Sequence, residues 1–237
     1  MLGYLRKDFY LYRKQILMFG IGILLISSIA WIDPPMQNMG DDSKGVILVL
    51  DAIICIMIFL IIGMFEQCLY ELDENCKWKM FVVAAPGCER AFIISKYVLT
   101  VFISVITGLW CNGIAVVASY RNDVTINLWW LILSLFSFQM IMRAIEIPII
   151  FRFGSKYGSI YRMTVGFFLC FGVMVYLLFG DLSIWGSEEQ ILDTIVELIS
   201  GNQYVMLRNF SIRMFVVAGL CYLISYFVSV RLYKKGV

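Results

Sequence analysis

The sequence predicts an all-α polytopic membrane protein with six transmembrane helices and with its N- and C-termini in the cytoplasm. Composition is the first observation behind this prediction. Of the 237 residues, 61% are hydrophobic and 15% are charged, whereas a soluble domain has about 45–50% and about 25%. A chain with so little polar surface needs the membrane as its solvent, and a soluble enzyme is therefore excluded.

Six apolar stretches are the second observation. Each approaches the length of about 20 mostly apolar residues that a membrane-spanning helix needs. They are residues 15–32, 45–65, 98–119, 128–150, 163–179 and 214–232. The segments between them are too short for an independent soluble domain, so we expect a single transmembrane domain over residues 1–237.

The distribution of positive charge is the third observation, and it predicts the orientation. Of the 19 Lys and Arg residues, fourteen fall on the side that holds both termini, four fall on the other side, and one lies within a span. Cytoplasmic loops carry an excess of Lys and Arg. Both termini are therefore expected in the cytoplasm.

Residues 1–14 are expected to form an amphipathic interface helix before the first span. Apolar side chains recur there at helical spacing, with basic side chains among them. The apolar set is Leu2, Leu5, Phe9 and Tyr12, and the basic set is Arg6, Lys7, Arg13 and Lys14. Such a helix suits the surface of an anionic inner leaflet. The alternative is a positive flank of the first span with no role of its own.

Residues 180–213 are expected outside the membrane, between the fifth and sixth spans. Ser187 and Gln190 have the spacing of a capping box at a helix start. An apolar face at helical spacing follows over residues 191–199. This pattern predicts a short extracellular helix.

Several classes of chemistry are excluded. The chain has no histidine, which removes histidine-dependent catalytic triads and histidine-based zinc sites. It also has no GxxxxGK[ST] phosphate loop, so we expect any ATP hydrolysis to occur on another subunit. We expect no catalytic residue, cofactor site or metal site on this chain, and no nucleic-acid partner.

Asp51, Arg143 and Glu146 are the ionisable residues within the predicted spans. Such groups are costly in hydrocarbon, so they are expected to face the bundle interior, a cavity or one another. Arg143 and Glu146 have the i,i+3 spacing of an ion pair on one helix face. The pair either lines a polar path or gate or holds the fourth span against its neighbours. Asp51 is either a carboxylate of an outer vestibule or the partner of an outer Arg or Lys.

The cytoplasmic loop over residues 66–97 is the more specific feature. Its acidic, aromatic, turn-forming and basic side chains are Glu71, Asp73, Glu74, Trp78, Phe81, Pro86, Arg90 and Lys96. A short acidic-to-aromatic segment of the loop is expected to stop at Pro86 and Gly87, and a new helix then enters the third span. Exposed aromatic side chains on such a loop favour anchoring in a pocket of a partner protein. The alternative for Trp78 and Phe81 is an interfacial aromatic belt.

Three motifs in this sequence resemble those of short ABC-2-type transporter permeases of Gram-positive bacteria. The first loop carries the acidic pair, Trp, Ala-Pro turn and Lys-Tyr helix start of that family. The second match is the Pro148–Gly154 run with Arg152, Phe153 and Gly154, followed by Lys156, and the third is the basic start at Leu5–Asp8. Glu89 and Lys156 depart from the family pattern, because each reverses the charge that is usual at its position. These reversed charges indicate a dedicated partner subunit with compensating charges, or they weaken the family resemblance at these two positions.

The resemblance implies an exporter of two permease chains and two separate ABC ATPase chains in a bacterial cytoplasmic membrane. The segment around Glu71–Phe81 would then be the coupling helix that docks on the ATPase, which would bind ATP and Mg²⁺. The second permease chain would be identical or different. The chain is similar to permeases of phenol-soluble-modulin-type exporters, which implies a hydrophobic or amphipathic peptide as cargo.

Two other possibilities remain open at the level of sequence. Drugs, antimicrobial peptides or lipids are alternative cargoes for an exporter. An ATP-independent membrane scaffold or immunity protein that binds its target directly is an alternative function. Co-purification of an ATPase subunit distinguishes the exporter from the scaffold.

Overall fold

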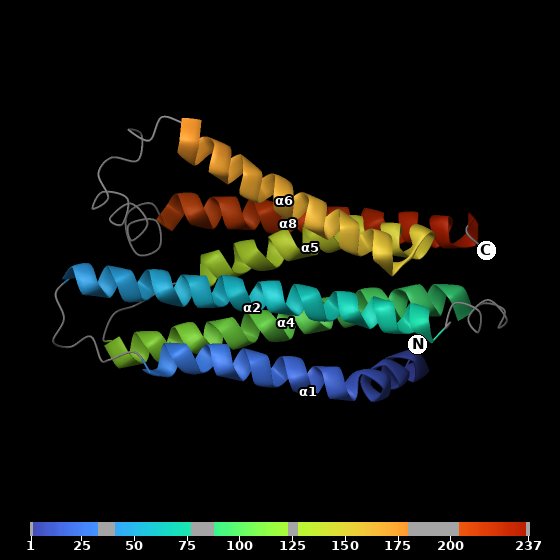
Figure 1. Cartoon of the computed structure of the whole chain (residues 1–237), viewed down its shortest axis with the longest axis horizontal. Coiled ribbons are helices and arrows are strands. Elements are labelled where there is room, and N and C mark those ends of the chain that lie inside the picture. The colour runs from blue at the N-terminus through green and yellow to red at the C-terminus, as the bar shows by residue number, and fades with distance from the viewer. Residues whose placement is uncertain (1, 33–40, 77–87, 123–127, 180–203, 236–237) are drawn as a thin grey trace.

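The computed structural model describes residues 2–32, 41–76, 88–122, 128–179 and 204–235. They form six helices, α1 (Leu2–Ile32), α2 (Asp41–Asn75), α4 (Cys88–Asn122), α5 (Trp129–Phe153), α6 (Ser155–Phe179) and α8 (Tyr204–Lys235). Successive helices run in opposite directions, as Figure 1 shows. The all-α prediction is confirmed for the described part of the chain.

Five of these helices are long and apolar enough to cross a membrane: α1, α2, α4, α5 and α8. They contain five of the six predicted spans. The remaining predicted span, residues 163–179, lies within α6, and its passage through a membrane stays a prediction. The chain is therefore a multi-pass membrane protein.

The start of α1 and the end of α8 lie at the same end of the bundle, which we call the terminal end (Figure 1). The end of α2, the start of α4 and the turn between α5 and α6 also lie there. All segments that the sequence predicts to be cytoplasmic and that the structure describes thus gather at one end. The cytoplasmic location of this end stays a prediction.

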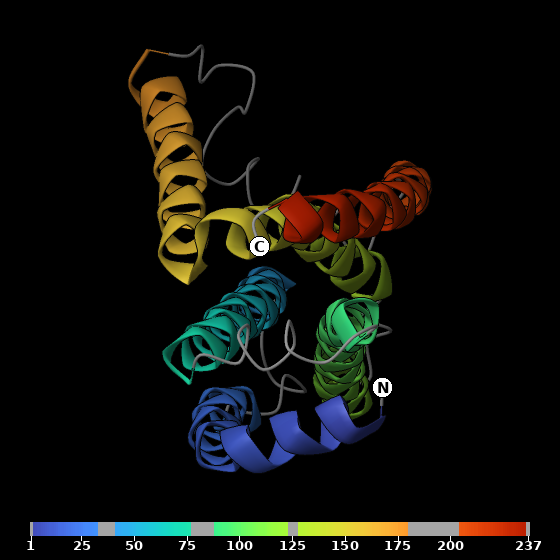
Figure 2. The same ribbon diagram turned by 90° about the vertical axis from the view of Figure 1, so that its right-hand side faces the viewer.

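The helices are arranged in layers when the bundle is viewed from the terminal end (Figure 2). α1 lies on one side, α2 and α4 lie in the middle, and α5 and α8 lie on the other side. The most extensive packing is between α5 and α8. α6 begins beside α5 and tilts away from the bundle along its length (Figures 1 and 2).

Buried apolar side chains hold these layers together in three clusters. One joins α2, α4 and α5 around Cys55, Ile58 and Ile114. Another joins α4, α5 and α8 around Ile93 and Ile147. The third packs Tyr12 of α1 against Phe65, Leu69 and Leu99 of α2 and α4. Close packing is the main attraction between helices in a membrane, where lipid is as apolar as the side chains.

The ends of two helices differ from the expected boundaries. α2 continues to Asn75, past the end of its apolar stretch, so the first part of the predicted loop 66–97 is helical. α4 begins at Cys88, directly after the predicted stop at Pro86. Trp78, Phe81 and Pro86 lie outside the described residues, as does the predicted extracellular helix over residues 188–199.

α1 is one continuous helix in which the predicted interface segment and the first span are not separated. Its first part lies across the terminal end of the bundle and then bends into the direction of the other helices (Figure 2). A role at the membrane surface stays a prediction for this first part.

Candidate functional site: charged clusters and the helix turn at the terminal end

Two arginines and two glutamates form a buried cluster between α2, α5 and α6, which we call the Arg–Glu cluster. Its members are Glu66, Arg143, Glu146 and Arg162. The Arg143 guanidinium pairs with Glu66 through Nε and with Glu146 through a terminal nitrogen at 2.7 Å. A terminal nitrogen of Arg162 lies 2.7 Å from the same Glu146 oxygen. The predicted pair Arg143–Glu146 is therefore confirmed, and each of its members has a further partner on another helix.

Neutral groups complete the cluster. Arg143 and Arg162 both donate to the backbone carbonyl of Gly63 in α2. The amide of Gln139 donates to Glu66 at 3.4 Å, and the hydroxyl of Ser104 in α4 donates to it at 3.5 Å. Buried charges need both an opposite charge and hydrogen bonds to offset their loss of water. The cluster meets this requirement except at Glu146 Oε1 and Gln139 Oε1, which are buried without a hydrogen-bond partner among the described residues. It links four helices.

The cluster has no net charge, and its inner members are almost inaccessible. Glu66, Arg143 and Glu146 each expose only 1% of their surface. A cargo molecule therefore does not reach these three groups in this conformation. The geometry favours the interpretation in which the charges hold α5 against its neighbours, while a gating role would require the cluster to open.

Asp51 does not belong to this cluster. It is buried on α2 beside the apolar residues Ala52, Ile54 and Cys55. Glu66 follows Asp51 by fifteen positions, which correspond to about 22 Å of helix. The three intramembrane candidates are thus divided between two places in the bundle.

A second cluster, which we call the Lys–Asp cluster, ties α1 to α2 and α4 at the terminal end. Lys7 lies 2.8 Å from Asp73 and 2.9 Å from Asp8. Lys96 lies 3.0 Å from Asp8 and also pairs with Asp73. Two positive and two negative side chains therefore balance one another. Asp8, Asp73 and Lys96 are buried.

Aromatic rings surround the Lys–Asp cluster. The ammonium group of Lys96 lies 5.3 Å from the ring centre of Tyr12 and 5.7 Å from that of Phe92. Such contacts stabilise a cation that has lost its water. The Tyr12 hydroxyl donates to the Leu69 carbonyl at 3.0 Å, which adds a further link between α1 and α2.

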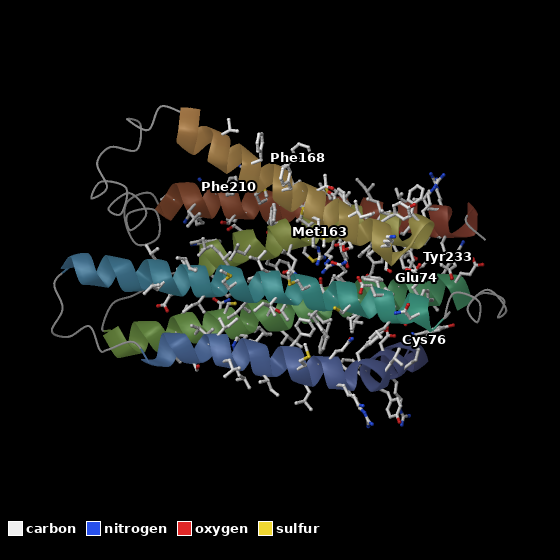
Figure 3. The ribbon with its side chains drawn as sticks, viewed as in Figure 1. Glu74, Cys76, Met163, Phe168, Phe210 and Tyr233 are labelled. Atoms are coloured by element: carbon white, nitrogen blue, oxygen red, sulfur yellow. The ribbon has the colours of Figure 1, made fainter. Side chains whose placement is uncertain are left out.

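The turn between α5 and α6 meets the end of α2. A Glu74 oxygen accepts a hydrogen bond from the backbone N–H of Ser155 at 2.6 Å. Ser155 is the first residue of α6, so Glu74 satisfies one of the free N–H groups at that helix start. Figure 3 shows Glu74 at the terminal end, beside this turn. The acidic pair of the first loop and the second loop motif thus meet in space.

Gly154 makes this contact possible. Its φ of 99° ends α5 in a conformation that other residues rarely adopt, and its N–H donates to Ile150 at 2.9 Å. A Cβ atom at this position would lie 2.8 Å from a Glu74 oxygen. Glycine is therefore required both by the backbone conformation and by the close approach of Glu74.

The other described residues of the predicted partner surface are accessible. Glu71 and Arg90 are exposed near the ends of α2 and α4. Arg152, Phe153 and Lys156 are exposed around the α5–α6 turn. Asp73 and Lys96 differ from this group, because the Lys–Asp cluster buries them. Their ion pairs join the ends of α1, α2 and α4.

Sequence reasoning did not find Glu66 and Arg162, nor the buried role of Lys7 and Asp8. Glu66 directly follows an apolar stretch and Arg162 directly precedes one, so both look like ordinary flanking charges. The only hint of the cluster in the sequence was the oppositely charged pair Arg143–Glu146, because its span offers neither residue a second charged partner. Four charges from three helices form a cluster only through tertiary packing.

The model of the ABC-2 family transporter protein matches residues 3–234 of this chain. The chain belongs to the ABC-2 transporter family. Comparison with curated proteins and with solved structures gave no significant match. Family membership implies a permease subunit of an ABC transporter, which spans the membrane several times and works with a separate ABC ATPase subunit. The predicted membership of the ABC-2 family is therefore confirmed.

Proposed function

We propose that this chain is the permease subunit of an ABC exporter that couples ATP hydrolysis on a partner ATPase to export of a hydrophobic or amphipathic peptide. The family match over residues 3–234 is the observation that carries the proposal. The chain would lie in a bacterial cytoplasmic membrane with its terminal end inside. It would pair there with a second permease chain, identical or different.

The ATPase would dock at the terminal end. Exposed charges of both signs lie there on three helices, namely Glu71 of α2, Arg90 of α4 and Arg152 of α5. Charged and polar groups of this kind give an interface its register and specificity. Trp78, between α2 and α4 in sequence, would supply the aromatic anchor.

The helix ends would transmit movement because they are joined to one another. The Glu74–Ser155 hydrogen bond links the end of α2 to the start of α6. The Lys–Asp cluster links the same part of α2 to α1 and α4. A displacement of the docking segment by the closing ATPase would therefore reach α1, α4 and α6 together, since ion pairs and hydrogen bonds connect these ends.

Peptide cargo is supported by the resemblance of the sequence to peptide exporters and by the apolar character of the bundle. α6 carries exposed apolar side chains, including Met163 and Phe168, along the part that tilts away from the bundle (Figure 3). Large apolar surfaces of this kind accept lipid, another helix or an amphipathic cargo. Cargo or the second permease chain would contact the bundle along α6.

The test is co-purification in mild detergent followed by an ATPase assay. We expect an ATPase subunit to purify with the chain, with vanadate-sensitive hydrolysis that rises when an amphipathic peptide is added. Trp78→Ala should remove the peptide-dependent rise without changing the thermal stability of the chain. Trp129→Ala, which changes an exposed Trp at the opposite end of the bundle, is the matched control and should leave it intact.

Three results would contradict the proposal or a part of it. Recovery of the chain alone, with no hydrolysis under any gentle condition, would favour the ATP-independent scaffold or immunity protein. Unchanged stimulation in Trp78→Ala would remove the coupling role of this residue, while leaving the permease assignment in place. Stimulation by a drug or lipid, but by no peptide, would change the cargo.

A further inference from the structure

α1 is attached to the bundle at two places and packs loosely between them. At the terminal end, Lys7 and Asp8 belong to the Lys–Asp cluster. Further along, the indole N–H of Trp110 in α4 donates to the Ser27 hydroxyl at 3.1 Å. In the most apolar part of α1 only 6% of the residues are buried, compared with 50% in α2 and in α4.

A groove of about 350 Å³ lies between these two attachments. α1, α2 and α4 line it, and Figure 2 shows these three helices at the corners of a triangle. Its lining is apolar and includes Phe9, Ile16 and Gly20 of α1 and Phe102 and Ile106 of α4. We call it the α1 groove.

The groove offers water few hydrogen-bond partners. The polar side chains in its lining are Asp8, Tyr12, Thr107 and Trp110. Asp8 is neutralised by lysine, Tyr12 donates to the Leu69 carbonyl, Thr107 donates to the Ile103 carbonyl and Trp110 donates to Ser27. Apolar cavities without free polar groups stay dry or hold an apolar ligand. The occupant of the α1 groove is therefore apolar where it contacts the helices.

The length of the groove suits an acyl chain. Its α1 lining runs from Asp8 to Leu24, which is about 24 Å of helix. One leaflet is about 20–22 Å thick when its headgroup layer is included, and about 15 Å of this is hydrocarbon. All three helices are candidate spans, so the groove lies among the lipid chains of one leaflet.

Exposed arginines stand beside the terminal end of the groove. Arg6 precedes the groove residue Phe9 by three positions, and Arg13 follows Phe9 by four, so both neighbour it on the helix surface. Both side chains are exposed, and the Arg13 guanidinium rests 5.1 Å from the ring centre of Tyr10. The candidate span of α1 begins at Arg6, which places Arg6 at the level of the lipid headgroups. Arg13 lies seven residues, about 10 Å, further along the helix, and its long side chain reaches back toward the headgroups.

We propose that the α1 groove binds one phospholipid, with an acyl chain between α1, α2 and α4 and an anionic headgroup against Arg6 and Arg13. The lipid fills the space that the two attachments of α1 leave open. This site differs from the general lipid contact of a membrane protein because three helices line the groove that holds the chain and because two arginines select the headgroup. It is separate from the proposed peptide path along α6 and does not depend on it.

The test measures phospholipid binding to the detergent-purified chain by native mass spectrometry. The probes are phosphatidylglycerol and phosphatidylcholine with the same acyl chains. Gly20→Leu places a side chain in the groove, since a Cβ at Gly20 meets no atom within 4 Å. Gly22→Leu is the matched control, because Gly22 is equally open but does not line the groove. Ile16→Phe is a second groove-filling variant if Gly20→Leu does not fold.

We expect Gly20→Leu to weaken phosphatidylglycerol binding about tenfold, because the leucine displaces roughly two methylene groups of the acyl chain. Gly22→Leu should bind as the unchanged chain does. Arg6→Gln with Arg13→Gln should reduce the preference for phosphatidylglycerol over phosphatidylcholine by roughly thirtyfold, because each basic side chain contributes to attraction of an anionic lipid.

Equal binding by Gly20→Leu, Ile16→Phe and the unchanged chain would overturn the proposal. An unchanged headgroup preference after both arginine substitutions would overturn the assignment of the headgroup site. Displacement of the lipid by one amphipathic peptide per chain, with the peptide lost in Gly20→Leu, would show that the groove takes cargo and would also overturn the lipid proposal.

Discussion

Removal of one charge from the Arg–Glu cluster tests whether the cluster holds α5 in place. Arg143→Met keeps a long side chain but leaves Glu66 and Glu146 with Arg162 as the only cation in the cluster. Unpairing a buried charge costs about 3–5 kcal/mol. The lower value is expected here, since helices in a membrane also find partners when they separate.

A loss of about 3 kcal/mol corresponds to a fall of about 6–12 °C in Tm for a chain of this length. The assay is thermal unfolding of the purified chain in mild detergent, followed by tryptophan fluorescence. Arg231→Met changes an exposed arginine on α8 and should alter the free energy of unfolding by less than about 0.5 kcal/mol.

A double variant separates the loss of charge balance from the loss of packing. Arg143→Gln with Glu66→Gln removes one charge of each sign and leaves Glu146 with Arg162, a neutral pair at 2.7 Å. It should melt at a higher temperature than Arg143→Gln alone, since neighbouring charges couple in a double-mutant cycle. A Tm for Arg143→Met within about 2 °C of the unchanged chain would refute the reasoning, because about 3 kcal/mol predicts more.

Two further substitutions test the links at the terminal end. Gly154→Ala should lower the free energy of unfolding by about 1–3 kcal/mol, because alanine is strained at this φ and its Cβ displaces Glu74. Glu74→Gln keeps an acceptor oxygen and should lower the free energy of unfolding by less. Equal Tm values for Gly154→Ala and the unchanged chain would contradict this account. Lys96→Met should lower the free energy of unfolding by about 3 kcal/mol and speed proteolysis of α1, because Asp8 and Asp73 then share one lysine. An unchanged rate of digestion would show that the Lys–Asp cluster does not hold α1.

The membrane spans could be predicted from the sequence because their signal is local. About 20 neighbouring apolar residues are enough to make a helix stable in hydrocarbon, whatever it later packs against. The start of α4 after Pro86 was predictable for the same reason, since proline and glycine act on the adjacent backbone. The extension of α2 to Asn75 was not predicted, because its acidic last turns resemble a loop by composition alone.

The pairing of Arg143 with Glu146 was predictable from their spacing on one helix. Their contacts with Glu66 and Arg162 were not, because these residues lie on other helices and look like ordinary flanking charges. The burial of Asp73 and Lys96 could not be predicted from the sequence either, because each lies in a segment rich in charged residues.

The sequence by itself determined that this chain crosses a membrane several times, and its motifs placed it with ABC-2 permeases. Local hydrophobicity and short motifs suffice for both conclusions. Only the tertiary structure decided which charges meet, that Glu74 approaches Gly154 at the start of α6, and that α1 leaves a groove against α2 and α4. These features depend on distances between residues far apart in the chain, which are set by how whole helices pack.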